Sequence, residues 1–145
     1  MRTPAQLLAV ASLAVSAWAA DPFVGTWKWN RAKSQTGSAD FKSRTFIVTA
    51  TEQGHHIVQK DVLPDGTTMP RERDDVLDGK ERASFEGLVV VAKRVDSHTK
   101  ASTWTKAGKT VRKTTDTISK DGKTFTHSVN DLARGEGRVW VFERE

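Results

Sequence analysis

Short segments in which polar and apolar residues alternate follow one another along most of the chain, separated by glycine-containing turns. The segments are rich in Thr, Val, Phe and Trp, which favour strands. Pairs such as Asp65-Gly66 and Asp121-Gly122 supply the positive φ angles that tight hairpin turns need. The pattern predicts strands near residues 24–30, 41–52, 55–63, 68–77, 80–85, 87–95, 100–106, 109–119, 124–132 and 138–144, with a helical turn or loop between 31 and 40.

Consecutive hairpins of this kind predict an all-β fold. We expect a single antiparallel up-and-down β-barrel of about eight to ten strands, because closing a wide sheet removes its exposed edges. A sandwich of two sheets is the alternative. A barrel of this size holds either packed side chains or one small ligand in its interior.

The first 19 residues have a different character from the rest of the chain. Arg2 gives a positive start, residues 7–15 form an apolar run, and Ala17-Trp18-Ala19 has the small-x-small pattern of a cleavage site. These features predict a signal peptide helix over 1–19, followed by the barrel domain over 20–145, with an ordinary N-terminal helix as the alternative. We therefore expect a periplasmic or secreted protein. The apolar run is too short for an integral membrane span.

Composition narrows the classes of function. The chain has 145 residues, enough for one domain, and no cysteine, which excludes disulfides, thiolate metal sites and a catalytic thiol. Its formal net charge is +5, but the charges alternate in sign without forming a basic block, so we expect no nucleic-acid partner. No phosphate loop, nucleophile elbow or zinc-protease motif is present, and we expect no cofactor. The sequence carries no signal for an oligomeric state.

The first predicted strand contains Gly25-Thr26-Trp27, with Trp27 and Trp29 on one face. A Gly-x-Trp on the first strand resembles the calycin group, which includes the lipocalins and the fatty-acid-binding proteins. The order of residues 25–30, Ala32-Lys33-Ser34 and the later turns is most similar to exported bacterial lipocalin-like proteins of unknown function. The resemblance implies structural roles for Gly25 and Trp27. Residues 31–40 are too few for the two helices that follow the first strand in fatty-acid-binding proteins.

The last predicted strand places Arg138, Trp140 and Phe142 on one face. Fatty-acid-binding proteins have an Arg-x-Tyr at this place that holds the ligand carboxylate, and here Trp140 replaces the Tyr. Two roles are open. Arg138 could bind a ligand anion bidentately, or Arg138 or Arg144 could stack on Trp27 and close the base of the barrel.

Other candidate residues are fewer. His55 and His56 are adjacent on a strand, so they point to opposite faces, and we expect no metal site. Asp116 and His127 could meet on neighbouring strands as an acid–base pair. The residues that we predict to line a ligand site are Arg138, Trp140, Trp29, Trp104 and His127.

The leading hypothesis is an exported lipocalin-like barrel that binds a small molecule, either apolar or amphiphilic. In one version of this hypothesis the ligand is anionic. One alternative is an envelope structural or interaction protein whose barrel is filled with side chains. Another is an enzyme that uses the lumen, with His127, Asp116 or Arg138 as its chemical groups. The size of the cavity inside the barrel should distinguish binding from a filled interior.

Overall fold

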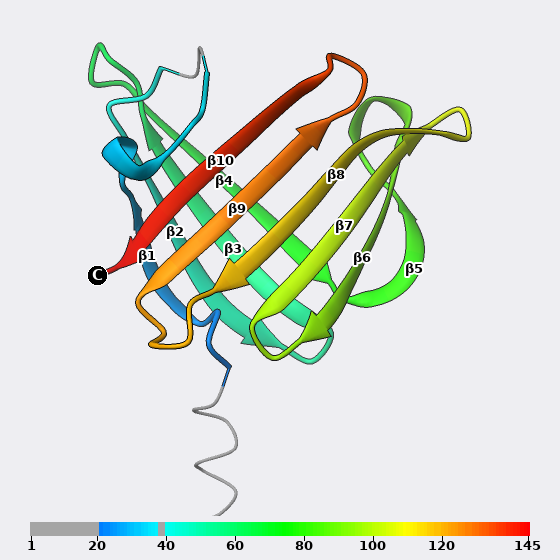
Figure 1. The fold of residues 1–145 in the computed structure, drawn as a ribbon, viewed down its shortest axis with the longest axis horizontal. Coiled ribbons are helices and arrows are strands. Elements are labelled where there is room, and N and C mark those ends of the chain that lie inside the picture. The colour runs from blue at the N-terminus through cyan, green and yellow to red at the C-terminus, as the bar shows by residue number, and fades with distance from the viewer. Residues whose placement is uncertain (1–20, 38–39) are drawn as a thin grey trace, which may run out of the picture.

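The computed structural model describes residues 21–37 and 40–145, so the signal peptide predicted over 1–19 lies outside the described residues. Ten antiparallel strands make up nearly all of this part of the chain (Figure 1). They are β1 (Gly25–Trp29), β2 (Ser43–Thr51), β3 (Gly54–Val62), β4 (Thr68–Val76), β5 (Asp78–Ala83), β6 (Leu88–Asp96), β7 (Thr99–Lys106), β8 (Lys109–Ile118), β9 (Thr124–Asp131) and β10 (Glu136–Arg144). Two 3-10 turns accompany them, Arg31–Lys33 and Phe85–Gly87, the first where the sequence predicts a helical turn or loop.

Apart from β4 and β5, strands that follow one another in the chain pair with each other, and β1 pairs with β10, giving the order β4-β3-β2-β1-β10-β9-β8-β7-β6-β5. The sheet curls into a nearly closed barrel (Figure 1). Strands β4 and β5 are its two edges, and within the described residues no backbone ladder joins them. The prediction of an all-β, single antiparallel barrel is therefore confirmed, with the strand number at the upper end of the expected range.

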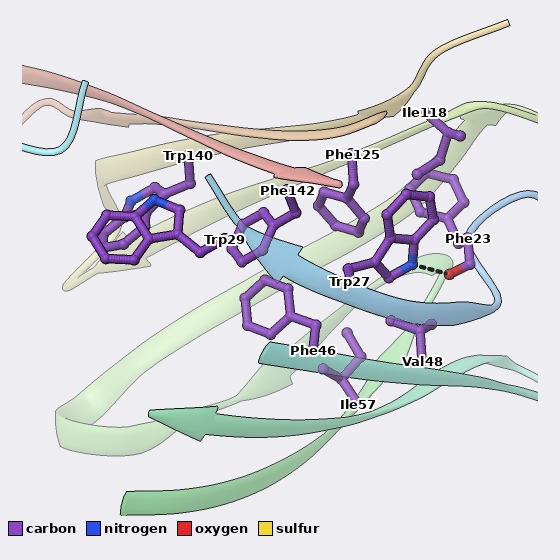
Figure 2. Packing of buried hydrophobic residues seen from close by; sticks show 10 residues of the cluster. All are labelled: Phe23, Trp27, Trp29, Phe46, Val48, Ile57, Ile118, Phe125, Trp140 and Phe142. Carbon is purple, nitrogen blue, oxygen red and sulfur yellow. Dashed lines mark hydrogen bonds between the residues drawn. The ribbon is translucent and has the colours of Figure 1, made fainter. Parts of the chain in front are cut away.

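The register brings aromatic side chains together at one end of the barrel, which we call the base. Trp27 pairs across the sheet with Phe46, and Phe142 pairs with Phe125. Phe46 and Phe142 stack with their ring centroids 4.5 Å apart. Figure 2 shows the whole cluster of buried apolar residues: Phe23, Trp27, Trp29, Phe46, Val48, Ile57, Ile118, Phe125, Trp140 and Phe142. Aromatic pairs of this kind add about 0.5–1.5 kcal/mol each beyond the burial of their area.

The segment before β1 closes the base. The Trp27 indole Nε1 donates to the Phe23 carbonyl at 2.9 Å (Figure 2). The Arg144 guanidinium lies 4.2 Å from the Trp27 ring and donates to the carbonyls of Pro22 and Val24 at 2.9 and 2.8 Å. Of the two arginines considered for this stack, Arg144 therefore makes it, and Arg138 lies elsewhere.

The opposite end of the barrel, the mouth, is formed by the connections β1–β2, β3–β4, β5–β6, β7–β8 and β9–β10 (Figure 1). Residues 21–37 and 40–145 include no helix with the length and hydropathy needed to cross a membrane.

Candidate functional site

A cavity of about 480 Å³ lies at the mouth of the barrel. Its lining comes from five strands and from the segment before β2, and it is unusually rich in arginine. The lining residues are Asp40, Phe41, Arg44, Arg71, Arg112, Val129, Asp131, Arg138 and Trp140. The aromatic cluster packs inside the barrel next to this cavity (Figure 2), and one of its members, Trp140, belongs to the lining.

Arg44 is built into the wall of this cavity. Its guanidinium lies 4.4 Å from the ring centroids of both Phe41 and Trp140. It also forms two hydrogen bonds with the carboxylate of Asp61, at 2.7 and 2.9 Å, and Asp61 is only 1% exposed. The Gln59 amide donates a further bond to Asp61 at 2.9 Å. Because a buried carboxylate is costly without a partner, Arg44 is committed to this ion pair and its charge is neutralised there.

The other three arginines of the lining are less completely paired. The Arg138 guanidinium lies 3.3 Å from Glu136, whose side chain is 55% exposed, so solvent weakens that pair. Among the described residues, no carboxylate comes within the 4.0 Å ion-pair distance of Arg71 or Arg112. Two carboxylates, Asp40 and Asp131, line the cavity together with the four arginines, and Asp40 has the Arg31 guanidinium 3.6 Å away, so positively charged groups outnumber negatively charged ones in the lining.

Aromatic side chains form the apolar part of the site. Trp140 lines the cavity, and Trp29 packs behind it with a centroid separation of 5.2 Å (Figure 2). The Trp29 indole donates to Ser34 Oγ at 2.9 Å, which fixes the ring. Trp104 lies next to the lining residue Arg112, whose guanidinium is 5.8 Å from its ring centroid. The Trp104 Nε1 atom is buried and has no hydrogen-bond partner among the described residues.

A second set of charged side chains lies deeper in the barrel and is fully paired. The buried Lys100 ammonium is 2.8 Å from Asp75 and 3.9 Å from Asp116. Asp116 is hydrogen-bonded to His127 Nδ1, so the pairing of these two residues expected from the sequence is present. Neither residue is among those that line the mouth cavity. Burial by itself would raise the pKa of Asp75, but the Lys100 and Arg73 charges outweigh it and lower the pKa.

His55 connects this set to the N-terminal segment. Its Nε2 atom lies 2.8 Å from Asp21, and the Arg94 guanidinium lies 3.2 Å from the same Asp21 oxygen. The His55 ring is fully buried against Phe23. Burial, together with the nearby Lys100 charge, lowers the pKa of His55 despite its bond to Asp21. The contacts among Asp21, His55 and Arg94 thus hold residues 21–24 against the barrel wall.

The structure brings some of the predicted site residues together and separates others. Arg138 and Trp140 line the cavity, while Trp29 and Trp104 touch lining residues. His127 is part of the deeper set. Sequence reasoning missed the lining residues Phe41, Arg44, Arg71 and Arg112 and the buried Asp61 and Lys100. One signal was available for Arg44, since it shares a strand face with Phe46 and Val48.

Comparison with known proteins supports the fold. No family model matches the chain, and no curated protein matches its sequence. A Schistosoma mansoni fatty-acid-binding protein in complex with arachidonic acid is similar, with a TM-score of 0.60 and 11% identity, covering 87% of this chain and 98% of its own. Zebrafish ileal bile acid-binding protein complexed with cholic acid is similar with a TM-score of 0.52 and 13% identity, and the match covers 86% of this chain and 99% of that protein. Secretory abundant heat soluble protein 4 from Ramazzottius varieornatus is similar with a TM-score of 0.54 and 14% identity, and the match covers 86% of this chain and 96% of that protein.

The barrel is therefore of the calycin type, and the resemblance predicted from the first strand is confirmed at the level of the fold. Two of the similar structures hold amphiphilic carboxylic acids. Unlike the two-helix connection expected in fatty-acid-binding proteins, the described part of the β1–β2 connection contains one 3-10 turn.

Proposed function

We propose that this barrel binds a small amphiphilic molecule whose negatively charged group lies among the arginines of the mouth cavity. The observation that carries the proposal is the cavity itself, in which Arg138 and Trp140 face the same open space as Arg71 and Arg112. The similar barrels that hold arachidonic acid and cholic acid support an amphiphilic acid as the class of ligand.

The dimensions of the cavity are consistent with one small ligand. Its volume of about 480 Å³ falls within the range of about 300–1,000 Å³ typical of small-molecule sites. The apolar part of the ligand would gain about 25 cal/mol for each Å² removed from water against Phe41, Val129 and Trp140. A charge-assisted hydrogen bond to an arginine adds about 1.5–3 kcal/mol.

Tryptophan fluorescence provides the test, because Trp140 lines the cavity and Trp29 and Trp104 touch its walls. We expect decanoate to shift or quench the emission and to bind more tightly than decanol. Arg138→Met should weaken decanoate binding about ten- to hundredfold and leave decanol unchanged.

Lys113→Met is the matched control, since Lys113 is exposed on β8 and does not line the cavity. Equal weakening of acid and alcohol by Arg138→Met, with lowered stability, would mean that Arg138 braces the structure. No change in emission with any amphiphile would contradict the proposal. Such a result would favour the second candidate, a barrel that acts through its outer surface, for which the packed base is the supporting observation.

We also propose that the protein is exported, on the strength of the three-part pattern over residues 1–19. Mass spectrometry of protein from the native cell envelope should give a chain that starts at Ala20. Ala19→Leu, which removes the small residue before the cleavage site, should cause the precursor to accumulate. Wild-type protein that retains Met1 and stays in the cytosol would contradict export.

A further inference from the structure

We propose that the ligand carries a doubly negative group, a phosphate monoester attached to an apolar part, in preference to a single carboxylate. This inference rests on the proposed function and specifies the ligand class for the same cavity. It is carried by the balance of charge and by the directions from which hydrogen-bond donors reach the site.

The charges around the cavity divide into those that are paired within the protein and those that are not. Arg44 is held by Asp61 in a two-bond ion pair. Asp40 has the Arg31 guanidinium 3.6 Å away. The remaining charged lining residues are three arginines, at positions 71, 112 and 138, and one carboxylate, Asp131. Arg138 also has Glu136 3.3 Å away, but the Glu136 side chain is 55% exposed, so solvent weakens this pair. Arg112 and Arg138 are half-buried, whereas Arg71 is exposed. A singly charged ligand would leave part of the positive charge of the two half-buried arginines uncompensated, which is unfavourable.

The three arginines also approach from different walls of the barrel. Arg71 lies on β4, at one edge of the sheet, whereas Arg112 and Arg138 lie on β8 and β10. A carboxylate has two oxygens in one plane and suits a single guanidinium that binds it bidentately. A phosphate monoester has three strong acceptor oxygens in a tetrahedral arrangement and carries a charge of about −1.5 to −2 at pH 7. It can therefore accept bonds from several arginines at once.

Trp104 lies behind the Arg112 wall of the cavity. The Trp104 Nε1 atom is buried without a hydrogen-bond partner among the described residues. Its ring lies beside Arg112, one of the three arginines. A buried donor without a partner is uncommon in folded proteins and costs about 1–3 kcal/mol. Trp104 is not among the residues that line the cavity, so its ring forms part of the wall behind Arg112.

Isothermal titration calorimetry of the purified protein can test the inference with dodecyl phosphate, dodecanoate and inorganic phosphate, each below its micelle concentration. At pH 7.5 we expect dodecyl phosphate to bind at least tenfold more tightly than dodecanoate. At pH 5.5 the ratio should fall severalfold, because the second proton of a phosphate monoester binds with a pKa of about 6. Inorganic phosphate should bind much more weakly than dodecyl phosphate.

Substitutions of the cavity arginines test which of them produce the preference for dodecyl phosphate. Arg112→Gln and Arg71→Gln should each reduce the preference for dodecyl phosphate over dodecanoate, and Arg112→Lys should retain part of it. Lys113→Gln is the control on the outer face of the same strand. Circular dichroism of each variant checks that the barrel is folded.

The possible outcomes separate this inference from the proposed function. Equal affinities for dodecyl phosphate and dodecanoate would contradict the preference for a doubly charged group and leave the proposal of amphiphile binding in place. If inorganic phosphate binds as tightly as dodecyl phosphate, the apolar part contributes nothing to binding and the ligand is a free oxyanion. A lack of binding by all three compounds would overturn the proposed function together with this inference.

Discussion

Charged residues inside this barrel differ in how completely they are paired. In the deeper set, Lys100 contacts Asp75 and Asp116, and the Asp21 carboxylate contacts Arg94 and His55, so each charge has a partner within the protein. Around the mouth cavity, Arg71 and Arg112 have no carboxylate at ion-pair distance among the described residues. A complete set of partners indicates a structural role, and an incomplete one in a cavity indicates a place for a ligand.

Two adjacent histidines should affect the pH dependence of stability in opposite directions. The pKa of the buried His55 lies below its ordinary value of 6.5, so its contribution to stability is present above about pH 6.5 and is lost as the pH falls. The bond from His56 to Asp74 raises the pKa of His56, so that contribution is present below pH 6.5 and is lost as the pH rises through the raised value.

Urea unfolding at pH 7.5, 6.5 and 5.5 can check both signs. Relative to the wild type, His55→Asn should lose less of its stability on acidification, and His56→Asn should lose more. The two variants serve as controls for each other, because they replace neighbouring residues of one strand and should change the pH slope in opposite directions. An unchanged pH slope in His55→Asn would contradict the assignment of His55 as a neutral buried group.

The first and last strands meet where the base is closed, and one glycine allows this contact. Trp27 pairs with Arg144 across β1 and β10, and the Arg144 guanidinium then turns over the Trp27 ring. Gly25 has a φ of +148°, and a Cβ atom built on it would lie 2.2 Å from the Arg144 Nη1 atom. A side chain at position 25 would therefore displace a guanidinium held by three backbone carbonyls, those of Pro22, Val24 and Gly122.

Substitution of two glycines tests this arrangement. Gly25→Ala should destabilise the barrel by more than about 1 kcal/mol, because it strains the backbone and breaks the Arg144 contacts. Gly137 on β10 is the control, since no heavy atom lies within 4 Å of its built Cβ atom. Gly137→Ala should change stability by less than about 1 kcal/mol in either direction. Similar losses for the two variants, measured by urea unfolding, would contradict a specific role for Gly25.

At the scale of the whole molecule, stability is concentrated on one side of the barrel. The buried aromatic residues come from β1, β2, β9, β10 and the segment before β1 (Figure 2). By contrast, β5 is mostly exposed and pairs with β6 alone within the described residues. Regions with few buried contacts open locally at lower free energy than the core.

Native-state hydrogen exchange should show this asymmetry. We expect the amides of β1 and β10 that pair with each other to exchange near the global unfolding limit. The amides of β5 should exchange several orders of magnitude faster. The amides of β9, paired on both sides, serve as the internal reference for the core. Equal protection of β5 and β1 would mean that the barrel unfolds as one cooperative unit.

The seam between β4 and β5 was not predicted, but the sequence by itself determined the all-β class, a strand number of about eight to ten and the approximate bounds of the strands. It did so because period-two alternation and Asp-Gly turns act within ten or so residues, and hairpins between consecutive strands need no long-range information. The Gly-x-Trp of the first strand also led to the calycin type of barrel before any tertiary contact was known. The bounds of β3 and β8 were predicted to within about one residue.

The tertiary structure alone decided which charged residues face inward and which of them remain unpaired. Strands such as β4, with the sequence TMPRERDDV, carry charges on both faces, so alternation cannot show which face is buried. The stack of Arg144 on Trp27, the Arg44–Asp61 pair and the gathering of Arg71, Arg112 and Arg138 around one cavity depend on register and curvature. Those properties arise only when ten strands from the whole chain pack around a common interior.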